Sequence, residues 1–390
     1  MSVQVAHGIH GALRPTSPVS CRERCRKIGL PRQAATIYRS STEENISTIA
    51  VTASVKIPMI FKKILSFALL IASPYGYASC GSSFCAVNTH WDTQGFSHDS
   101  GWLIDLRYSY AKADQWRSGW KKLPVPAPSG SDEEIENRRT TNQLINLNID
   151  YAIDARWGIS VGLPFVLRDH AHTFDSSVTG AFGQRTKFSE FGDTRVLGKH
   201  SIPFGIGNSG LGLSFGLKLP TGSTDKTMSP RDPANPGTPY LLERSSQPGT
   251  GSTDAIVGAH YFSNVPDNAW GWFVGGQHQS AMATKSHYRP GNETKLDIGL
   301  HYELGQGITA LMQLNGQYRS RDTGINANPA SGGHSWSLSP GLTHALSDNL
   351  QLYGFVQRVL RQYVNHAPAD PLSGQLASRW SATVGLIRHL

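Results

Sequence analysis

Charged side chains recur at alternate positions along several stretches of the chain, and both signs occur on neighbouring stretches. They are Asp105, Arg107, Asp150, Asp193, Arg195, Lys199, Lys218, Asp254, Lys295, Asp297, His301 and Glu303. Alternate residues of a β-strand point to the same side, so these groups are expected to share one face. Mixed charges on one face can line a polar conduit and tune its selectivity. They can equally pair with one another and brace a filled interior.

A second group with chemical potential is the histidine pair His170 and His172, which follows Asp169. Imidazole nitrogens beside a carboxylate are suitable ligands for a transition metal. Nothing in the sequence fixes their geometry, and solvated residues of an external loop are the simpler interpretation. We therefore predict no metal site and name the two histidines only as candidates.

Motifs for catalysis and nucleotide binding are poor. Gly205-Ile206-Gly207 lacks the next glycine and the strand–turn–helix context of a nucleotide site. A barrel hydrolase would place a serine and a histidine together on the outer wall, and no such pair is evident. We predict no catalytic residues, no cofactor and no enzyme activity, and keep an outer-membrane hydrolase as an alternative.

The N-terminal part of the chain has the character of a leader. Two lysines precede a short apolar run over 64–72, and the small residues of Gly76-Tyr77-Ala78 follow it. This order is typical of a secretory signal peptide. We predict a signal over 59–78, and an extension over 1–58 that is either mispredicted or disordered.

Removing this leader changes the charge of the protein. The full chain carries +8, but ten basic and only three acidic side chains fall within residues 1–78. The remaining chain is close to neutral, so the basic composition gives no support for a nucleic-acid partner. In the exported chain, residues 79–100 are expected to form a periplasmic segment in which Cys80 and Cys85 make a local disulfide. A thiol pair that binds a metal is the alternative, although two ligands are an incomplete site.

The charged groups lie on stretches of the chain in which side-chain character alternates regularly. Twelve stretches between residues 101 and 390 alternate apolar with small or polar side chains, as in Leu296, Ile298 and Leu300 against Lys295, Asp297 and Gly299. The stretches are about ten residues long, which is the length that a tilted strand needs to cross a membrane. Strands of soluble sandwiches are usually shorter.

The connections between these stretches alternate between long polar loops and short turns. This sorting, with an even strand count, is typical of outer-membrane barrels, whose turns are periplasmic and whose loops are external. Outward aromatic residues gather at both strand ends, as interfacial girdles do. The sequence therefore predicts an all-β, antiparallel up-and-down barrel of about 12 strands over 101–390, in the outer membrane of a Gram-negative cell.

Several short phrases carry a family resemblance. They are Asn88-Thr89-His90-Trp91-Asp92, Gly192-Asp193-Thr194-Arg195, Leu219-Pro220-Thr221-Gly222, Gly249-Thr250-Gly251-Ser252-Thr253-Asp254 and Gln362-Tyr363-Val364-Asn365. Over residues 80–390 the chain resembles bacterial outer-membrane barrels of the phenol meta-degradation pathway family, which are loosely called transporters. The resemblance implies passage of small hydrophobic molecules and supplies no catalytic residues. His366 stands where family members often have glycine.

We therefore expect an outer-membrane channel, surrounded by lipid, for a small solute such as an aromatic or hydrophobic compound. A structural or surface-binding barrel, whose loops contact a metal or an envelope partner, is the alternative.

Overall fold

The computed structural model describes residues 101–125, 127–130, 133–135, 139–204, 209–228, 239, 241–265, 269–325 and 327–390. The predicted extension, the signal peptide and the segment with Cys80 and Cys85 lie outside the described residues, so they stay predictions. Within the described ranges, no helix has the length and apolar character to cross a membrane.

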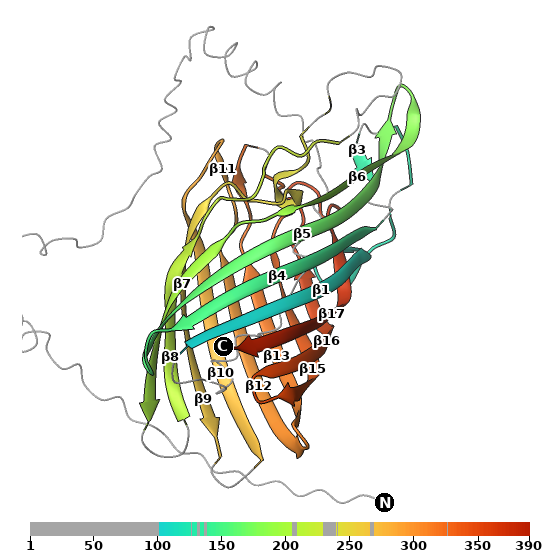
Figure 1. Ribbon diagram of the computed structural model, residues 1–390. Coiled ribbons are helices and arrows are strands. Elements are labelled where there is room, and N and C mark those ends of the chain that lie inside the picture. The colour runs from blue at the N-terminus through green and yellow to red at the C-terminus, as the bar shows by residue number, and fades with distance from the viewer. Residues whose placement is uncertain are drawn as a thin grey trace, which may run out of the picture. The chain divides into compact units, whose positions relative to one another are not determined.

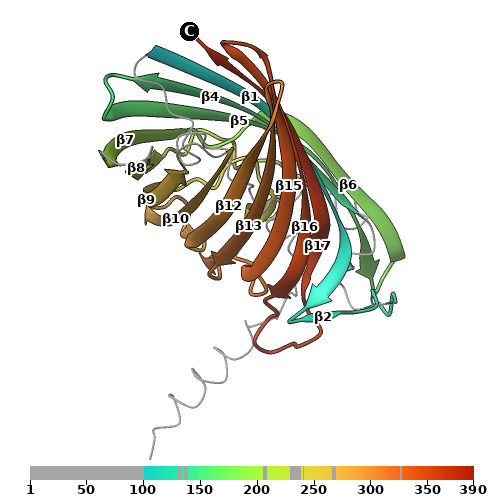
Figure 2. The same ribbon diagram turned by 90° about the horizontal axis from the view of Figure 1, so that it is seen from below.

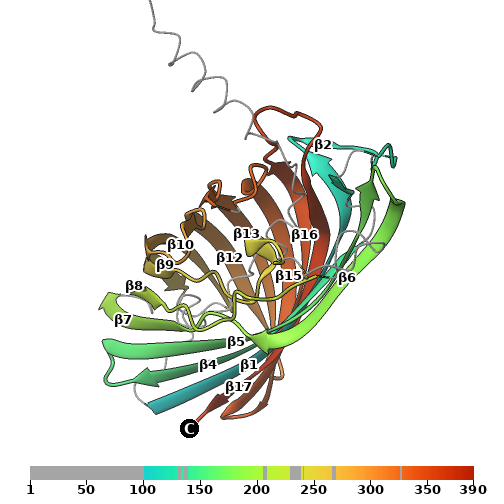
Figure 3. The same cartoon turned by 90° about the horizontal axis from the view of Figure 1, so that it is seen from above.

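Twelve long antiparallel strands form the wall of a closed barrel, which confirms the predicted fold. In the order of the wall they are β1 (Gly101–Ser118), β4 (Thr140–Ala152), β5 (Trp157–Ser176), β7 (Arg195–Phe204), β8 (Ser209–Lys218), β9 (Thr253–Asn264), β10 (Trp270–Ala283), β12 (Glu293–Gly305), β13 (Ile308–Arg319), β15 (Gly333–Ser347), β16 (Leu350–Val364) and β17 (Gln375–His389). Pairing of β17 with β1 closes the ring, and these two strands lie side by side in the views from below and from above (Figures 2 and 3).

The two ends of the barrel differ in their connections. Short turns join β4 to β5, β12 to β13 and β15 to β16, and we assign this end to the periplasm. The last residue of the chain reaches the start of β1 at the same end, where Leu390 N–H donates to Trp102 O at 2.9 Å. The other end carries the long external loops.

The external loops contain short elements of their own. These are β2 (Lys121–Lys122), β3 (Glu133–Ile135), β6 (Gly180–Phe191), the 3-10 helix η3 (Arg244–Ser246), β11 (Tyr288–Arg289) and β14 (Thr323–Gly324). The largest of them, β6, pairs with the outer half of β5 from Phe165 to Ser176, and the hairpin rises above the rest of the wall (Figure 1).

The β5–β6 hairpin corrects the prediction of a loop over 168–190. The segment is polar on both sides, so its strand character is not visible in the hydropathy. Polar cross-strand pairs stabilise it instead. On one side Arg185 donates to both carboxylate oxygens of Asp169, at 2.7 and 2.5 Å.

The outer face of the wall is apolar. Trp102, Tyr151, Trp157, Trp270 and Tyr302 are exposed near the periplasmic end, and Tyr108, Tyr318, Trp336 and Trp380 are exposed near the external end. Exposed Leu, Ile and Val side chains lie between these two groups. An apolar band between two aromatic girdles is the surface that a barrel presents to lipid.

The inner face packs aromatic rings against glycines of the neighbouring strand. A Cβ atom on Gly385 would overlap the Tyr353 ring, one on Gly341 would overlap Phe355, and one on Gly299 would overlap Phe273. Tyr353, Phe355 and Phe273 are buried. The glycines therefore let rings lie flat along the wall instead of crossing the interior.

This packing predicts unequal effects for two glycine substitutions on adjacent strands. Gly385→Ala should destabilise the barrel by about 1–3 kcal/mol, because the buried Tyr353 ring must move. Gly354→Ala should be close to neutral, since its Cβ would meet its nearest neighbour, Thr383 O, at 3.6 Å. Unfolding midpoints in urea, measured in lipid vesicles, check the pair, and equal midpoints for the two variants would contradict this packing.

Candidate functional site in the barrel interior

The charged residues predicted for the lumen face the inside of the barrel. Asp193 lies in the link between β6 and β7, and the others lie on wall strands, all but Lys199 and Asp254 next to an exposed residue. Asp105, Lys218, Asp254, Asp297 and His301 are buried, whereas Glu303 is exposed near the periplasmic mouth.

Three of these predicted residues form one ion cluster. Lys218 Nζ lies 2.9 Å from Asp193 Oδ2 and 3.3 Å from Asp254 Oδ2, and all three side chains are buried. Lys218 also donates to Ser252 O at 3.0 Å, and the Thr250 N–H donates to Asp193 at 2.9 Å. The cluster joins the β6–β7 link, β8, the loop before β9 and the first residues of β9, where Asp254 lies. In the buried interior, each charge has an opposite partner.

Most other predicted charges also have partners of opposite charge or polar character. Lys199 pairs with Asp150 at 2.9 Å and Lys295 with Glu293 at 3.2 Å. Arg195 donates to Gln279 at 3.2 Å, and Asn315 donates to Asp297 at 2.7 Å. The sequence reasoning missed Glu293, which carries an inward charge but lies at the start of its strand.

Asp105 connects the charged groups to an aromatic residue. It accepts hydrogen bonds from Asn148 at 3.0 Å and from the Tyr353 hydroxyl at 2.7 Å. Arg107, two residues along the strand, lies close enough to act on it electrostatically. The inner face therefore compensates its charges locally and holds them with neutral donors.

An apolar cluster occupies the inner face toward the periplasmic end. It consists of Leu103, Leu311, Tyr353, Phe355 and Ile387, each at most 5% exposed. Side chains so well buried do not line an open water-filled passage. The sequence analysis missed this cluster because the parity of the strand over 350–362 is ambiguous. The glycines that pair with its aromatic residues, such as Gly385 with Tyr353, are the sequence signal that could have assigned the inward side of this strand.

The histidine pair lies in the external β5–β6 hairpin, on a strand and not in the solvated loop that was predicted. His170 and His172 are on β5 and are buried. His170 Nε2 and His172 Nδ1 are 3.0 Å apart, Thr140 Oγ1 lies 2.8 Å from His170 Nδ1, and Gln184 Oε1 lies 2.8 Å from His172 Nε2. These contacts bridge β4, β5 and β6. No cluster of three or more metal-ligating side chains occurs among the described residues.

Asp322 links the external loops through hydrogen bonds and an ion pair. It accepts hydrogen bonds from the Tyr288 hydroxyl at 2.8 Å and from the Gly291 N–H at 2.8 Å, and it pairs with Arg319 at 2.6 Å. Burial is the main cause that raises the pKa of Tyr288. The phenol therefore stays a neutral donor at physiological pH, and the Arg244 guanidinium lies 5.0 Å above its ring.

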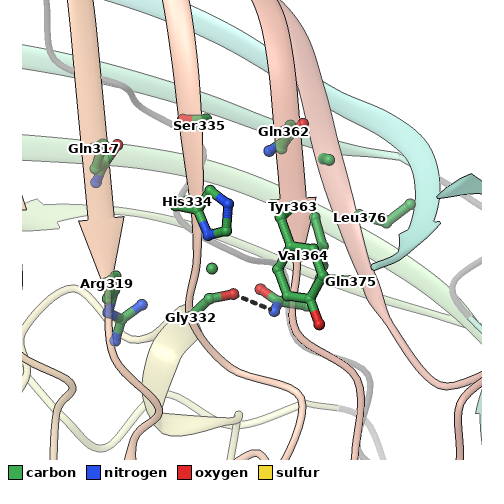
Figure 4. Close-up of a pocket in the computed structure, with 12 residues that line it drawn as sticks. Gln317, Arg319, Gly332, His334, Ser335, Gln362, Tyr363, Val364, Gln375 and Leu376 are labelled. Carbon is green, nitrogen blue, oxygen red and sulfur yellow. Dashed lines mark hydrogen bonds between the residues drawn. The ribbon is translucent and has the colours of Figure 1, made fainter. Parts of the chain in front are cut away.

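A small polar hollow lies at the external ends of β13, β15, β16 and β17 (Figure 4). Its volume is about 30 Å³, and its lining includes Gln317, Ser335 and Gln362. Gln375 closes one side by donating to Gly332 O at 3.0 Å. A hollow of this size holds a water molecule but no organic solute.

One sequence pattern of hydrolases occurs at residues 212–216, Gly-Leu-Ser-Phe-Gly. It lies within β8, where each of these residues pairs with both neighbouring strands. A nucleophile elbow needs a sharp turn from a strand into a helix. The pattern at Ser214 is therefore part of a continuous wall strand.

The buried ion cluster predicts a large effect for one charge removal. Lys218→Met should destabilise the barrel by about 3–5 kcal/mol, because it leaves Asp193 and Asp254 buried without their cation. Lys112→Met removes one member of a partly exposed pair with Asp114 and should cost less than about 1 kcal/mol. Denaturant unfolding in vesicles measures both, and a Lys218→Met loss no larger than that of Lys112→Met would argue against the cluster.

The sequence profile of the family described as "Putative MetA-pathway of phenol degradation" matches residues 139–368, which is more than half of the chain. No curated protein sequence matches significantly.

Solved structures show a similar fold. An outer membrane channel from Pseudomonas putida F1 aligns with a TM-score of 0.52 at 12% identity, over 78% of this chain and 100% of that chain. The transport unit of the autotransporter AIDA-I from Escherichia coli scores 0.43 at 11% identity, covering 80% and 95% of the two chains. The CymD monoaromatic hydrocarbon channel scores 0.40 at 10% identity, covering 81% and 94%. The two scores below 0.5 support no conclusion, so the similarity of fold rests on the first alignment.

Proposed function

The chain belongs to the MetA-pathway of phenol degradation family, and from this premise we propose that it is an outer-membrane channel for a small uncharged solute, with aromatic compounds as the first candidates. The closed wall and its apolar outer band support a place in the outer membrane. The similar fold of an outer membrane channel fits the same role.

The observation that carries the solute class is the character of the inner face. Charges such as Lys218 and Asp254 are compensated within the wall, so a charged solute would have to compete with existing partners. Rings and aliphatic groups, including Phe355 and Leu311, form the buried cluster nearer the periplasm. An uncharged apolar solute can move these side chains apart without burying an unpaired charge. An ion that passed between them would itself be a buried, unpaired charge.

We propose no catalytic role. Ser214, the serine of the hydrolase-like pattern, lies on a regular strand. The strand continues past Ser214 without a sharp turn, so its hydroxyl is not presented to a substrate as in a nucleophile elbow. The inner and outer faces are better explained by passage of a solute through a wall that spans lipid.

Uptake by whole cells tests the proposal. A strain that lacks this protein should take up labelled phenol or toluene at low concentration faster when the protein is restored, because the lipopolysaccharide leaflet slows apolar solutes. Uptake of a labelled sugar of similar size should not change. Equal stimulation of both solutes would indicate a general porin, and stimulation of neither would favour the surface-binding alternative.

Removal of one inner ring should open the passage to ions. Phe355→Ala should raise the single-channel conductance in planar bilayers severalfold, since it deletes part of the buried apolar cluster. The matched control is Phe215→Ala, which removes an exposed ring from the outer face and should leave the conductance unchanged. An unchanged conductance in Phe355→Ala, with a folded barrel, would show that this cluster does not limit passage.

A further inference from the structure

The outer wall contains an apolar hollow that the passage of a solute does not explain. It has a volume of about 740 Å³ and extends over β13, β15, β16, β17 and β1. Its floor consists of small side chains, namely Ala310, Pro340, Gly354 and Ala382. Strand pairing brings these residues close together. Ala310 and Gly354 both pair with Leu342, which is two residues from Pro340, and Ala382 pairs with Val356, which is two residues from Gly354.

Larger exposed side chains form the borders of the hollow. Met312, Leu342, Val356 and Val384 are between 41% and 56% exposed, and Tyr108 stands at one edge. All of them face outward in the membrane band. The hollow is therefore a groove in the lipid-facing wall, and hydrocarbon is the solvent that meets it.

Three arginines lie on the same outer surface, just beyond the external end of the groove. Arg358 is level with Trp380, and Arg361 is level with Trp336. Arg379 and Trp380 both lie opposite Lys112, at an irregularity of the β1–β17 pairing, so they share the outer side. Trp336 and Trp380 belong to the external aromatic girdle, so the arginines stand at the height of the lipid headgroups. All three side chains are exposed.

These arginines have no acidic partner in the part of the chain that the structure describes. Asp114, a nearby outward acid on β1, is paired with Lys112 at 3.0 Å. Arg361 instead stacks on Trp120, with its guanidinium carbon 4.3 Å from the ring centroid. Trp120 also contacts Tyr363 at 5.2 Å between ring centroids. Stacking of this kind orients a guanidinium and leaves its edge N–H groups free to donate to phosphate.

We propose that the groove and the three arginines form one binding site for a phosphorylated lipid of the outer leaflet. An acyl chain lies in the groove over Gly354 and Ala382, and the phosphate groups accept hydrogen bonds from Arg358, Arg361 and Arg379. The apolar groove and the cationic arginines are adjacent. They follow one another along the membrane normal in the same order as the acyl chain and the phosphate groups of such a lipid.

A second copy of the chain is a poorer occupant of this groove. Two barrels in one membrane share their orientation, so a two-fold axis between them must run along the membrane normal. An isologous contact brings the same patch of both copies together. It would place the unpaired arginines of each copy opposite those of the other, at the same height, where like charges repel.

Lipid binding to the full chain, purified in detergent, tests the site. Native mass spectrometry with bis-phosphorylated lipid A should detect a complex with the wild-type protein. Arg358→Gln, Arg361→Gln and Arg379→Gln combined should weaken it by about tenfold or more, because charge-assisted hydrogen bonds to phosphate are lost. Gly354→Leu should also weaken it, by filling the floor of the groove while the arginines remain.

The matched control is Arg388→Gln, which removes an exposed arginine at the opposite end of β17 and should leave the affinity unchanged. Heat-modifiable migration verifies that each variant is folded. Equal binding by the triple variant, or equal binding of dephosphorylated lipid A, would overturn the proposal. Inorganic phosphate that binds as tightly as lipid A would indicate a free-anion site, and loss of a dimer in Gly354→Leu without loss of lipid would assign the groove to a second copy.

Discussion

The structure depends on the pairing of β17 with β1. In hydrocarbon an unpaired backbone N–H or carbonyl group has no water to bind, so a sheet can cross a membrane only when it has no open edge. The register from Leu103 against His389 to Arg117 against Gln375 closes the wall. Closure fixes which side chains face lipid and which face inward, and it brings residues from both ends of the chain together, as in the hydrogen bond from Tyr353 to Asp105.

Closure also creates the problem that the interior solves. Twelve strands enclose a narrow space, and charged groups placed there lose water. Lys218 therefore meets two carboxylates, and glycines such as Gly385 make room for rings along the wall. The same inner contacts stabilise the wall and determine which solutes can pass through it. A wall whose charges are already paired has little attraction left for an ion. The rest of its inner surface combines neutral polar side chains, such as Gln313 and Ser337, with the apolar cluster.

The fold was predictable because alternation is strict where one face meets lipid. The stretch from Leu296 to Leu304 shows this pattern, and β12 has the predicted inward and outward sides. The β5–β6 hairpin was missed, since it rises beyond the lipid and is stabilised by pairs such as Asp169 with Arg185 rather than by apolar burial. Likewise, the sequence placed Lys218, Asp193 and Asp254 on one face, but which charges meet depends on strand order and stagger. The inner position of Phe355 required the register, because its own strand alternates poorly.

The central claim is that the interior admits uncharged apolar molecules in preference to ions. Ser214 lies on the inner face of β8, on the same side as Lys218, and is half-buried, which makes Ser214→Cys a reporter of what enters. The reaction rates of this thiol in membranes with an uncharged aromatic maleimide and with a charged methanethiosulfonate, each added from the external side, measure the preference directly, once each rate is normalised to the reagent's reaction with a free thiol. We predict that the uncharged reagent reacts at least tenfold faster, as a penalty above about 1.4 kcal/mol for bringing a charge inside would give. Equal normalised rates would contradict the claim.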